Sequence, residues 1–229
     1  MTQVSRGPIA KGGPSCSRMG RSSGFPECAA ATRQPTGPAG RFCDIAVNAT
    51  TSDPRLAGRS LRRVAFDESQ IAERVRALGD EITRAYPEGD LLVLGLLKGS
   101  FIFLSDLVRQ ITRPLQVDFV VASSYGDATE SSGTVNLVYD PETRIEGKHI
   151  LLVEDIVDSG RTLNRLMDLL SQRKPRSLDV CALLHKHIAV ELRYPTAFVG
   201  FTAPNEFLVG YGLDHAENFR HLPYIASLQ

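Results

Sequence analysis

The sequence predicts an α/β fold with a mainly parallel central sheet flanked by helices. Two short, continuous apolar runs, residues 91–97 and 149–153, have the length of strands that are buried on both faces. A helical pattern follows each run, and a further strand is expected over residues 178–184. Strand, helix and strand in this order form a βαβ unit, which joins parallel strands. Ligands of such sheets bind beyond the carboxyl ends of the strands, so the chemistry is expected there.

The first ordered element is predicted to be a helix that begins after Asp67. Asp67 and Gln70 have the spacing of a capping box, in which each side chain accepts a hydrogen bond from the backbone N–H of the other residue. The apolar positions that follow share one helical face: Ile71, Val75, Leu78 and Ile82. Pro87, with a glycine two residues later, ends this helix.

The remaining elements follow from the same periodicities. A second helix is expected with its core positions at Phe101, Leu104, Leu107, Val108 and Ile111. A strand over residues 117–122 leads into a polar segment rich in Gly and Ser, residues 123–134, which is expected to be a mobile loop. Residues 135–139 return as a strand. The helix after the second buried strand has its core positions at Leu163, Leu166, Met167 and Leu170.

The first 60 residues differ in composition from the rest of the chain. They contain 21 Gly, Pro and Ser residues, and eight Lys and Arg against three Asp and Glu. Such a segment buries too little apolar surface to offset its chain entropy, so residues 1–60 are expected to be a disordered basic extension and residues 61–229 the folded domain. Only two aromatic residues, Phe25 and Phe42, lie among the basic ones, too few for a stacking platform, which argues against a nucleic-acid-binding arm.

Composition narrows the class of protein. The chain of 229 residues is 42% hydrophobic and 23% charged, which suits one sizeable core. No apolar run reaches the roughly 18 residues that span a bilayer, so no membrane association is expected. The four cysteines form neither a CxxC pair nor a zinc-like spacing with histidine, and free thiols in a reducing cytoplasm are expected.

The strongest chemical signal is the segment 153–162, Val-Glu-Asp-Ile-Val-Asp-Ser-Gly-Arg-Thr. A buried strand leads into Glu154 and Asp155, and a turn with Gly160 opens a helix. Backbone N–H groups at such a helix start, with the Ser159 and Thr162 hydroxyls, suit a phosphate dianion. The carboxylates suit a sugar diol or a hydrated Mg²⁺, although an aspartate here can also serve only as a helix cap. The chain has neither a GxxxxGK[ST] nor a GxGxxG motif, which argues against a P-loop protein and against a dinucleotide-binding protein.

This segment resembles the loop of type I phosphoribosyltransferases that binds phosphoribosyl pyrophosphate (PRPP). Further blocks in the same order, over residues 65–229, resemble the hypoxanthine-guanine branch of that family: Leu97-Lys98-Gly99-Ser100, Ser124-Tyr125, Leu184-His185-Lys186, Phe207-Leu208-Val209-Gly210-Tyr211-Gly212-Leu213-Asp214 and Phe219-Arg220. The resemblance implies a type I phosphoribosyltransferase fold with a small hood and a mobile loop. His185 and His187 depart from the family forms beside Lys186.

The resemblance also assigns roles to residues. The ribose 5-phosphate of PRPP would be held by Glu154, Asp155, Asp158, Ser159, Gly160, Arg161 and Thr162. The pyrophosphate would be held by Lys98, Gly99 and Arg220, with a cis peptide at the Lys-Gly pair. The purine would be held by Lys186, Phe207, Leu208 and Asp214. Asp158 would be the catalytic acid and base, Mg²⁺ would be bound by Glu154, Asp155 and Asp214, and Ser124 and Tyr125 would belong to the mobile loop.

The function that this resemblance implies is purine salvage. The enzyme would transfer the 5-phosphoribosyl group from PRPP to hypoxanthine or guanine, with Mg²⁺ as cofactor and as a homo-oligomer, a dimer or tetramer. A xanthine-preferring enzyme and a non-catalytic regulator that senses PRPP are the alternatives. The regulator is disfavoured because a PRPP sensor has no need of the purine-binding residues Lys186, Phe207 and Asp214.

Overall fold

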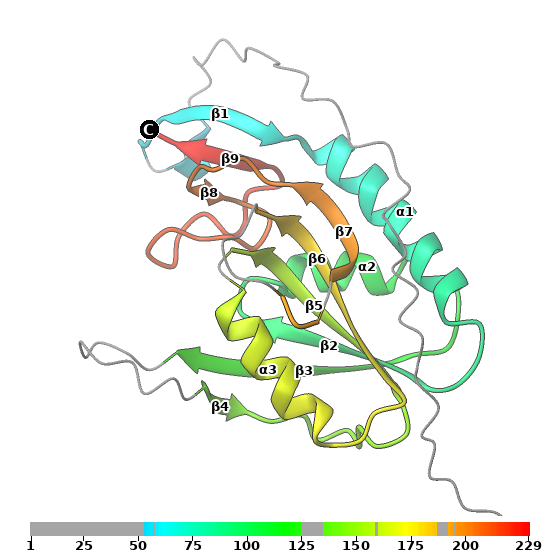
Figure 1. Ribbon diagram of the computed structural model, residues 1–229. Coiled ribbons are helices and arrows are strands. Elements are labelled where there is room, and N and C mark those ends of the chain that lie inside the picture. Colours follow the sequence, from blue (N-terminus) through cyan, green and yellow to red (C-terminus); the bar gives the residue numbers. More distant parts are fainter. Residues whose placement is uncertain (1–52, 57, 125–134, 159, 187–191, 195) are drawn as a thin grey trace, which may run out of the picture. The chain divides into compact units, whose positions relative to one another are not determined.

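A computed structural model describes the chain from residue 53 to its end, with short gaps (Figure 1). The described ranges are 53–56, 58–124, 135–158, 160–186, 192–194 and 196–229. Most of the predicted N-terminal extension, the greater part of the predicted mobile loop including Tyr125, and Ser159 and His187 lie outside the described residues.

The central sheet has six strands in the order β4-β3-β2-β5-β6-β7. Their bounds are β2 Leu91–Leu97, β3 Gln116–Ser124, β4 Val135–Tyr139, β5 His149–Val157, β6 Ser177–His185 and β7 Thr196–Thr202. All neighbours pair in parallel except β3 and β4, which are antiparallel. The predicted mainly parallel α/β sheet is confirmed, and β2 and β5 are its two central strands.

Helices cover both faces of this sheet (Figure 1). Helices α1, Glu68–Ala85, and α2, Phe101–Val108, pack on one face, where their apolar residues form one cluster with alternate residues of β2, β5 and β6. Helix α3, Arg161–Ser171, covers the other face and forms a second cluster with the intervening residues of the same strands. Burial on both faces explains why β2 and β5 are continuous apolar runs.

Helix α1 begins as its sequence predicts. The Asp67 side chain accepts a hydrogen bond from the Gln70 N–H at 2.9 Å, and the Gln70 side chain accepts one from the Asp67 N–H at 2.9 Å. The four predicted core positions of this helix are buried, each at most 2% exposed. Two local signals, the cap and the 3.6-residue period, were therefore sufficient to place this element.

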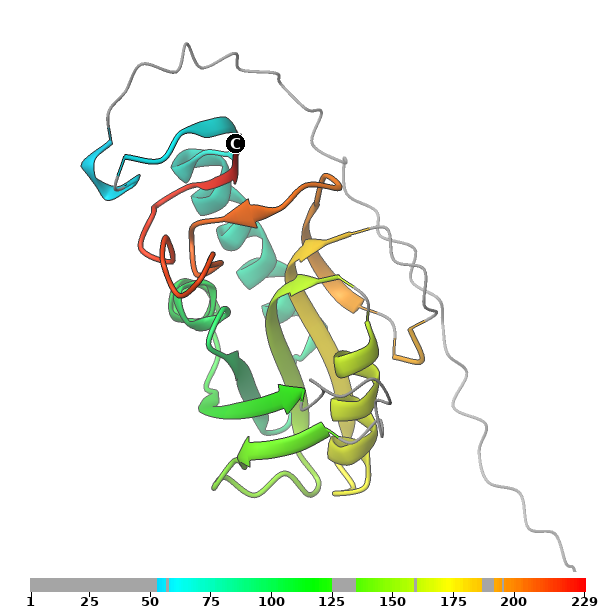
Figure 2. The same cartoon turned by 90° about the vertical axis from the view of Figure 1, so that its left-hand side faces the viewer.

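A second, three-stranded antiparallel sheet forms the hood, with strand order β1-β9-β8. Its strands are β1 Leu61–Phe66, β8 Leu208–Val209 and β9 Ile225–Leu228, and Figure 2 shows them beyond the ends toward which β5 and β6 point. The short helix Pro54–Leu56 packs here, with Leu56 buried against Val209, Phe219 and Leu222. Leu56, which the sequence assigned to the extension, thus contacts the hood.

Several local predictions were wrong. Glu154 and Asp155 lie within β5, which continues to Val157. Phe101 begins α2 but is 44% exposed, and Ile111 is buried beyond the end of that helix. The strands β1, β7, β8 and β9 were not predicted, because they are short or edge strands in which a period of two residues is weak. None of the described helices is long and apolar enough to cross a membrane.

Candidate active site

The turn after β2 lies against the carboxylates of β5. A Cβ atom at Gly99 would overlap Asp155 Oδ2, so only glycine lets the backbone approach this carboxylate so closely. The peptide bond between Leu97 and Lys98 is cis, one bond before the Lys-Gly bond at which the sequence resemblance placed it. The Lys98 side chain leaves the turn toward solvent and is 68% exposed.

Glu154 and Asp155 are acidic groups in an environment that opposes their ionisation. Burial, and secondarily the charge of Asp155, raise the pKa of Glu154 well above its usual value. Burial is also the main reason that the pKa of Asp155 rises to about 6, although Arg220 opposes this rise. Glu154 Oε2 is buried and has no hydrogen-bond partner among the described residues. An orphaned buried carboxyl oxygen implies a ligand that supplies a donor or a positive charge.

The segment between β8 and β9 brings a third group of polar residues to the same place. Gly212 has a φ of 104°, and a Cβ atom there would overlap the carbonyl oxygen of Gly99. The Arg220 guanidinium donates to the Gly212 carbonyl at 2.8 Å and pairs with Asp214 Oδ1 at 2.8 Å. Arg220 Nε is buried and has no hydrogen-bond partner in the described part of the chain. An unpaired buried donor of this kind suits a ligand that supplies an acceptor.

Lys186 and Asp158 face each other at the ends of two paired strands. The Lys186 N–H donates to the Val157 carbonyl at 3.0 Å, which extends the pairing of β5 with β6 by one step. The Lys186 ammonium lies 3.5 Å from Asp158 Oδ1. The Lys186 side chain is 18% exposed and the Asp158 side chain 68% exposed, so the lysine is the fixed partner and the aspartate the accessible one.

Phe207 is the exposed aromatic group of the site. Its side chain is 59% exposed, whereas the next residue, Leu208, is 5% exposed. The Phe207 and His215 rings are in a T-shaped arrangement, with 5.5 Å between their centroids and an interplanar angle of 89°. A large apolar ring held in this way while exposed to solvent is suited to stack on a planar ligand.

The predicted phosphate turn leads into α3. Gly160 is the N-cap of α3 and has a φ of 70°, in the left-handed region. Arg161 is exposed and Thr162 half-buried in the first turn, where backbone N–H groups lack intrahelical partners. This is the arrangement that the sequence predicts for a phosphate site. Ser124 ends β3, at the start of the predicted mobile loop.

The fold thus brings together three predicted groups that are far apart in the sequence: the turn after β2, the acidic end of β5 and the segment 210–220. Sequence reasoning missed Glu217. Its carboxylate lies 3.2 Å from the Lys98 ammonium, a hydrogen bond that lowers the pKa of Glu217. It also lies 3.5 Å from Arg220. A lone glutamate in a polar stretch has no pattern that could have revealed this position.

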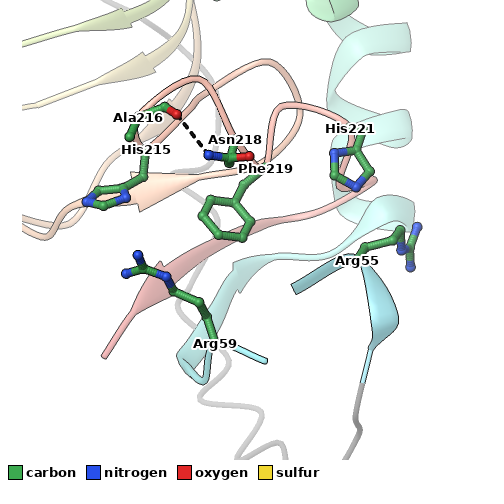
Figure 3. Close-up of a pocket in the computed structure, with 7 residues that line it drawn as sticks. All are labelled: Arg55, Arg59, His215, Ala216, Asn218, Phe219 and His221. Atoms are coloured by element: carbon green, nitrogen blue, oxygen red, sulfur yellow. Dashed lines mark hydrogen bonds between the residues drawn. The ribbon is translucent and has the colours of Figure 1, made fainter. Parts of the chain in front are cut away.

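A separate pocket of about 240 Å³ lies between this segment and the residues that precede β1 (Figure 3). It is lined by Arg55, Arg59, His215, Ala216, Asn218, Phe219 and His221. None of these residues belongs to the predicted site, and the acidic end of β5 does not line the pocket. The candidate site is therefore identified by its hydrogen bonds, its charges and its unpaired buried polar atoms, and not by this pocket.

Comparison with known proteins decides the family. A model of the phosphoribosyl transferase domain matches residues 66–216, which is more than half of the chain. This chain belongs to the phosphoribosyl transferase family. The predicted family, type I fold and class of enzyme are thereby confirmed.

Individual relatives agree over nearly their whole length. The hypoxanthine-guanine phosphoribosyltransferase of Dictyostelium discoideum is 49% identical over 172 residues, 73% of this chain and 96% of the relative. The hypoxanthine phosphoribosyltransferase of Escherichia coli strain K12 is 44% identical over 167 residues, which are 72% of this chain and 94% of the relative. A crystal structure of a hypoxanthine-guanine phosphoribosyltransferase from Bacillus anthracis, 42% identical, matches with a TM-score of 0.70 and covers 74% of this chain and 100% of that one.

Proposed function

We propose that this member of the family is a purine-salvage enzyme that transfers the 5-phosphoribosyl group from PRPP to hypoxanthine or guanine, releasing pyrophosphate. The observation that carries this proposal is an unpaired buried carboxyl oxygen of Glu154, beside Asp155, whose pKa burial raises and the charge of Arg220 lowers, and an unpaired guanidinium nitrogen of that arginine. Phe207 adds an exposed aromatic ring. These groups match, in turn, a sugar diol, a pyrophosphate and a planar base. The names of the relatives support this choice of substrates.

Binding would place the reacting carbon of PRPP between two groups of opposite charge. Glu154 and Asp155 would accept hydrogen bonds from the ribose hydroxyls, and the turn that ends at Thr162 would hold the 5-phosphate. Lys98, Arg220 and the backbone of Gly99 would hold the pyrophosphate, on which negative charge grows as its bond to the ribose breaks. Anchoring both ends converts the encounter with the base into an oriented displacement.

Asp158 would manage the proton of the base. It is exposed and lies 3.5 Å from the Lys186 ammonium, so its carboxylate is held at the edge of the site without being enclosed. As a base nitrogen bonds to the ribose carbon, the purine must lose a proton, and a carboxylate at N7 can accept it. The same residue returns the proton in the reverse reaction.

Lys186 would decide which purines are accepted. An ammonium group offers three donors and no acceptor, so it pairs with the O6 carbonyl of a 6-oxopurine and not with the amino group of adenine. Its side chain is only 18% exposed, so a donor placed against it would leave a poorly solvated mismatch. Phe207 would stack on the base, and backbone carbonyls near Leu208 and Asp214 would accept from the amino group of guanine.

The acidic groups fit a hydrated Mg²⁺. The described residues hold no cluster of three or more His, Cys, Asp or Glu that could bind a metal by itself. Mg²⁺ commonly keeps several waters and binds through one or two carboxylates together with substrate phosphates. Glu154, Asp155 and Asp214 would hold it with PRPP, and the orphaned Glu154 Oε2 is suited to this role. Bound Mg²⁺ would neutralise charge on the pyrophosphate.

We also propose that the chain works as a homo-oligomer in the cytoplasm. Phe101 at the start of α2 and Val117 and Phe119 on β3 are large apolar side chains that are 37% to 44% exposed. Exposed apolar side chains of this kind are typical of subunit interfaces. Sedimentation equilibrium of the intact chain tests the proposal, because a monomer at micromolar concentration would contradict it.

The decisive experiment compares initial rates with hypoxanthine, guanine, xanthine and adenine at saturating PRPP and Mg²⁺. Hypoxanthine and guanine should react at similar rates, xanthine more slowly, and adenine about 10⁴-fold more slowly, since its mismatch leaves buried donors unpaired. Xanthine as the best substrate would favour the xanthine-preferring alternative. Adenine as the best substrate would refute the role of Lys186, and no turnover with any base would favour the regulator.

A further inference from the structure

The carboxylate of Glu217 lies between the two cations assigned to pyrophosphate. Its Oε2 atom is 3.2 Å from the Lys98 ammonium and 3.5 Å from the Arg220 guanidinium. Lys98 and Arg220 come from two separate segments, the turn after β2 and the segment before β9. A single carboxylate oxygen therefore bridges the two positive groups to which a pyrophosphate oxygen would bind.

The backbone that carries Glu217 is held in an unusual conformation. His215 and Asn218 exchange two hydrogen bonds of 3.1 Å, and the two residues between them, Ala216 and Glu217, have φ values of 50° and 63°. Two-residue turns with both central residues in this region usually contain Asn and Gly. The left-handed conformation is unfavourable for a residue with a Cβ atom. Such strain persists where the surrounding contacts enforce it, and it concentrates at functional positions.

A contact with a predicted site residue fixes this turn. Asp214 Oδ2 accepts a hydrogen bond from the Glu217 N–H at 2.8 Å, while Asp214 Oδ1 pairs with Arg220 at 2.8 Å. One carboxylate thus ties the turn to the guanidinium. The Glu217 side chain itself is 66% exposed and has no other hydrogen bond than those to the two cations in the described part of the chain. It is therefore free to move away when an anion takes its place.

We propose that Glu217 is an internal counter-anion of the pyrophosphate pocket, paired with Lys98 and Arg220 while the pocket is empty and displaced when pyrophosphate or PRPP binds. This inference rests on the proposed function, which assigns those two cations to pyrophosphate. Glu217 keeps the cations positioned between turnovers. It also weakens binding of every pyrophosphate-bearing ligand, because the ligand must first replace two existing ion pairs, and it thereby assists release of the product.

The size of the effect follows from the exposure of the pairs. Lys98 and Glu217 are both about two-thirds exposed, and exposed ion pairs are weak and screened by salt. Removing the charge of Glu217 should therefore tighten binding of pyrophosphate by about three- to tenfold at low salt, and by less at high salt.

The test is a calorimetric titration of magnesium pyrophosphate into the full chain and into Glu217→Gln. Glu146→Gln is the matched control, since Glu146 is an exposed glutamate that pairs with Arg144 and is not part of the proposed site. We expect three- to tenfold tighter binding in Glu217→Gln and in Glu217→Ala, and unchanged binding in Glu146→Gln. Unchanged or weaker binding in both Glu217 variants would overturn the proposal, because it would mean that Glu217 only supports the cations or contributes to binding the metal.

Activity of the unaltered chain separates this inference from the function on which it rests. If that chain converts hypoxanthine or guanine and the Glu217 variants do not bind pyrophosphate more tightly, only the counter-anion proposal fails. If the chain converts neither base but the Glu217 variants bind pyrophosphate more tightly, the proposed substrates are wrong and the counter-anion proposal stands.

Discussion

Replacing Asp155 with Asn should stabilise the empty protein at neutral pH while impairing its binding of PRPP. Burial raises the pKa of Asp155 to about 6 from the usual 3.8, so ionising this group opposes folding. Asn has the same shape, carries no charge, and retains the oxygen that accepts the hydrogen bond from the Ile156 N–H at 2.9 Å. The substitution therefore removes the free-energy cost of ionising this carboxyl in the folded, ligand-free protein.

The pH dependence has a definite sign. The folded chain keeps the Asp155 proton up to about pH 6, whereas the unfolded chain releases it near pH 4. The unfolding free energy of the unaltered chain should therefore fall as pH rises from about 4 to 6, and this contribution should be constant above that range. A shift of about two pKa units corresponds to about 3 kcal/mol, which we reduce to about 1 to 2 kcal/mol because the residue is partly exposed to solvent.

Urea denaturation at pH 4 and pH 7.5 in metal-free buffer measures this effect. Asp155→Asn should match the unaltered chain at pH 4 and exceed its unfolding free energy by about 1 to 2 kcal/mol at pH 7.5. Asp80→Asn, at an exposed position on α1, is the matched control and should have no such pH-dependent effect. A loss of stability at pH 7.5, or a gain that is equal at both pH values, would refute the argument.

Three further predictions concern other parts of the chain. Asp158→Asn should lower kcat by about 10² to 10⁴-fold with little change in PRPP affinity, measured by steady-state kinetics and direct binding; a loss confined to affinity would contradict its role as acid and base. Gly99→Ala should abolish PRPP binding in calorimetry, because the new methyl group would overlap a site carboxylate, and normal binding would contradict the close approach. Removal of residues 1–52 should leave the melting temperature and activity unchanged. Removal of residues 1–60 should also remove the buried Leu56 from the hood and lower the unfolding free energy, measured by denaturation, by about 2 kcal/mol or more. Equal stability of the two truncated chains would instead place the start of the folded domain after residue 60.

Elements whose signals are local could be predicted from the sequence alone. The capping box at Asp67 placed the start of α1, and the uninterrupted apolar run Leu91–Leu97 placed a central strand. These signals depend only on residues within a few positions of one another, so they can be read without knowledge of the fold. The acidic segment at the end of β5 and the glycine after Lys98 were found because they resemble family motifs, which also implied the hood.

The contacts between distant residues could not be predicted in this way, because they depend on the packing of the chain. The hood sheet joins residues 61–66 to residues 225–228, a pairing between the two ends of the domain. Lys98 and Glu217 are 119 positions apart and lie on segments without a periodic pattern. Their ion pair exists because Gly99 and Gly212 let two turns approach each other and the β5 carboxylates closely. Such contacts depend on the packing of the whole chain, and the counter-anion in the pyrophosphate pocket could therefore be recognised only in three dimensions.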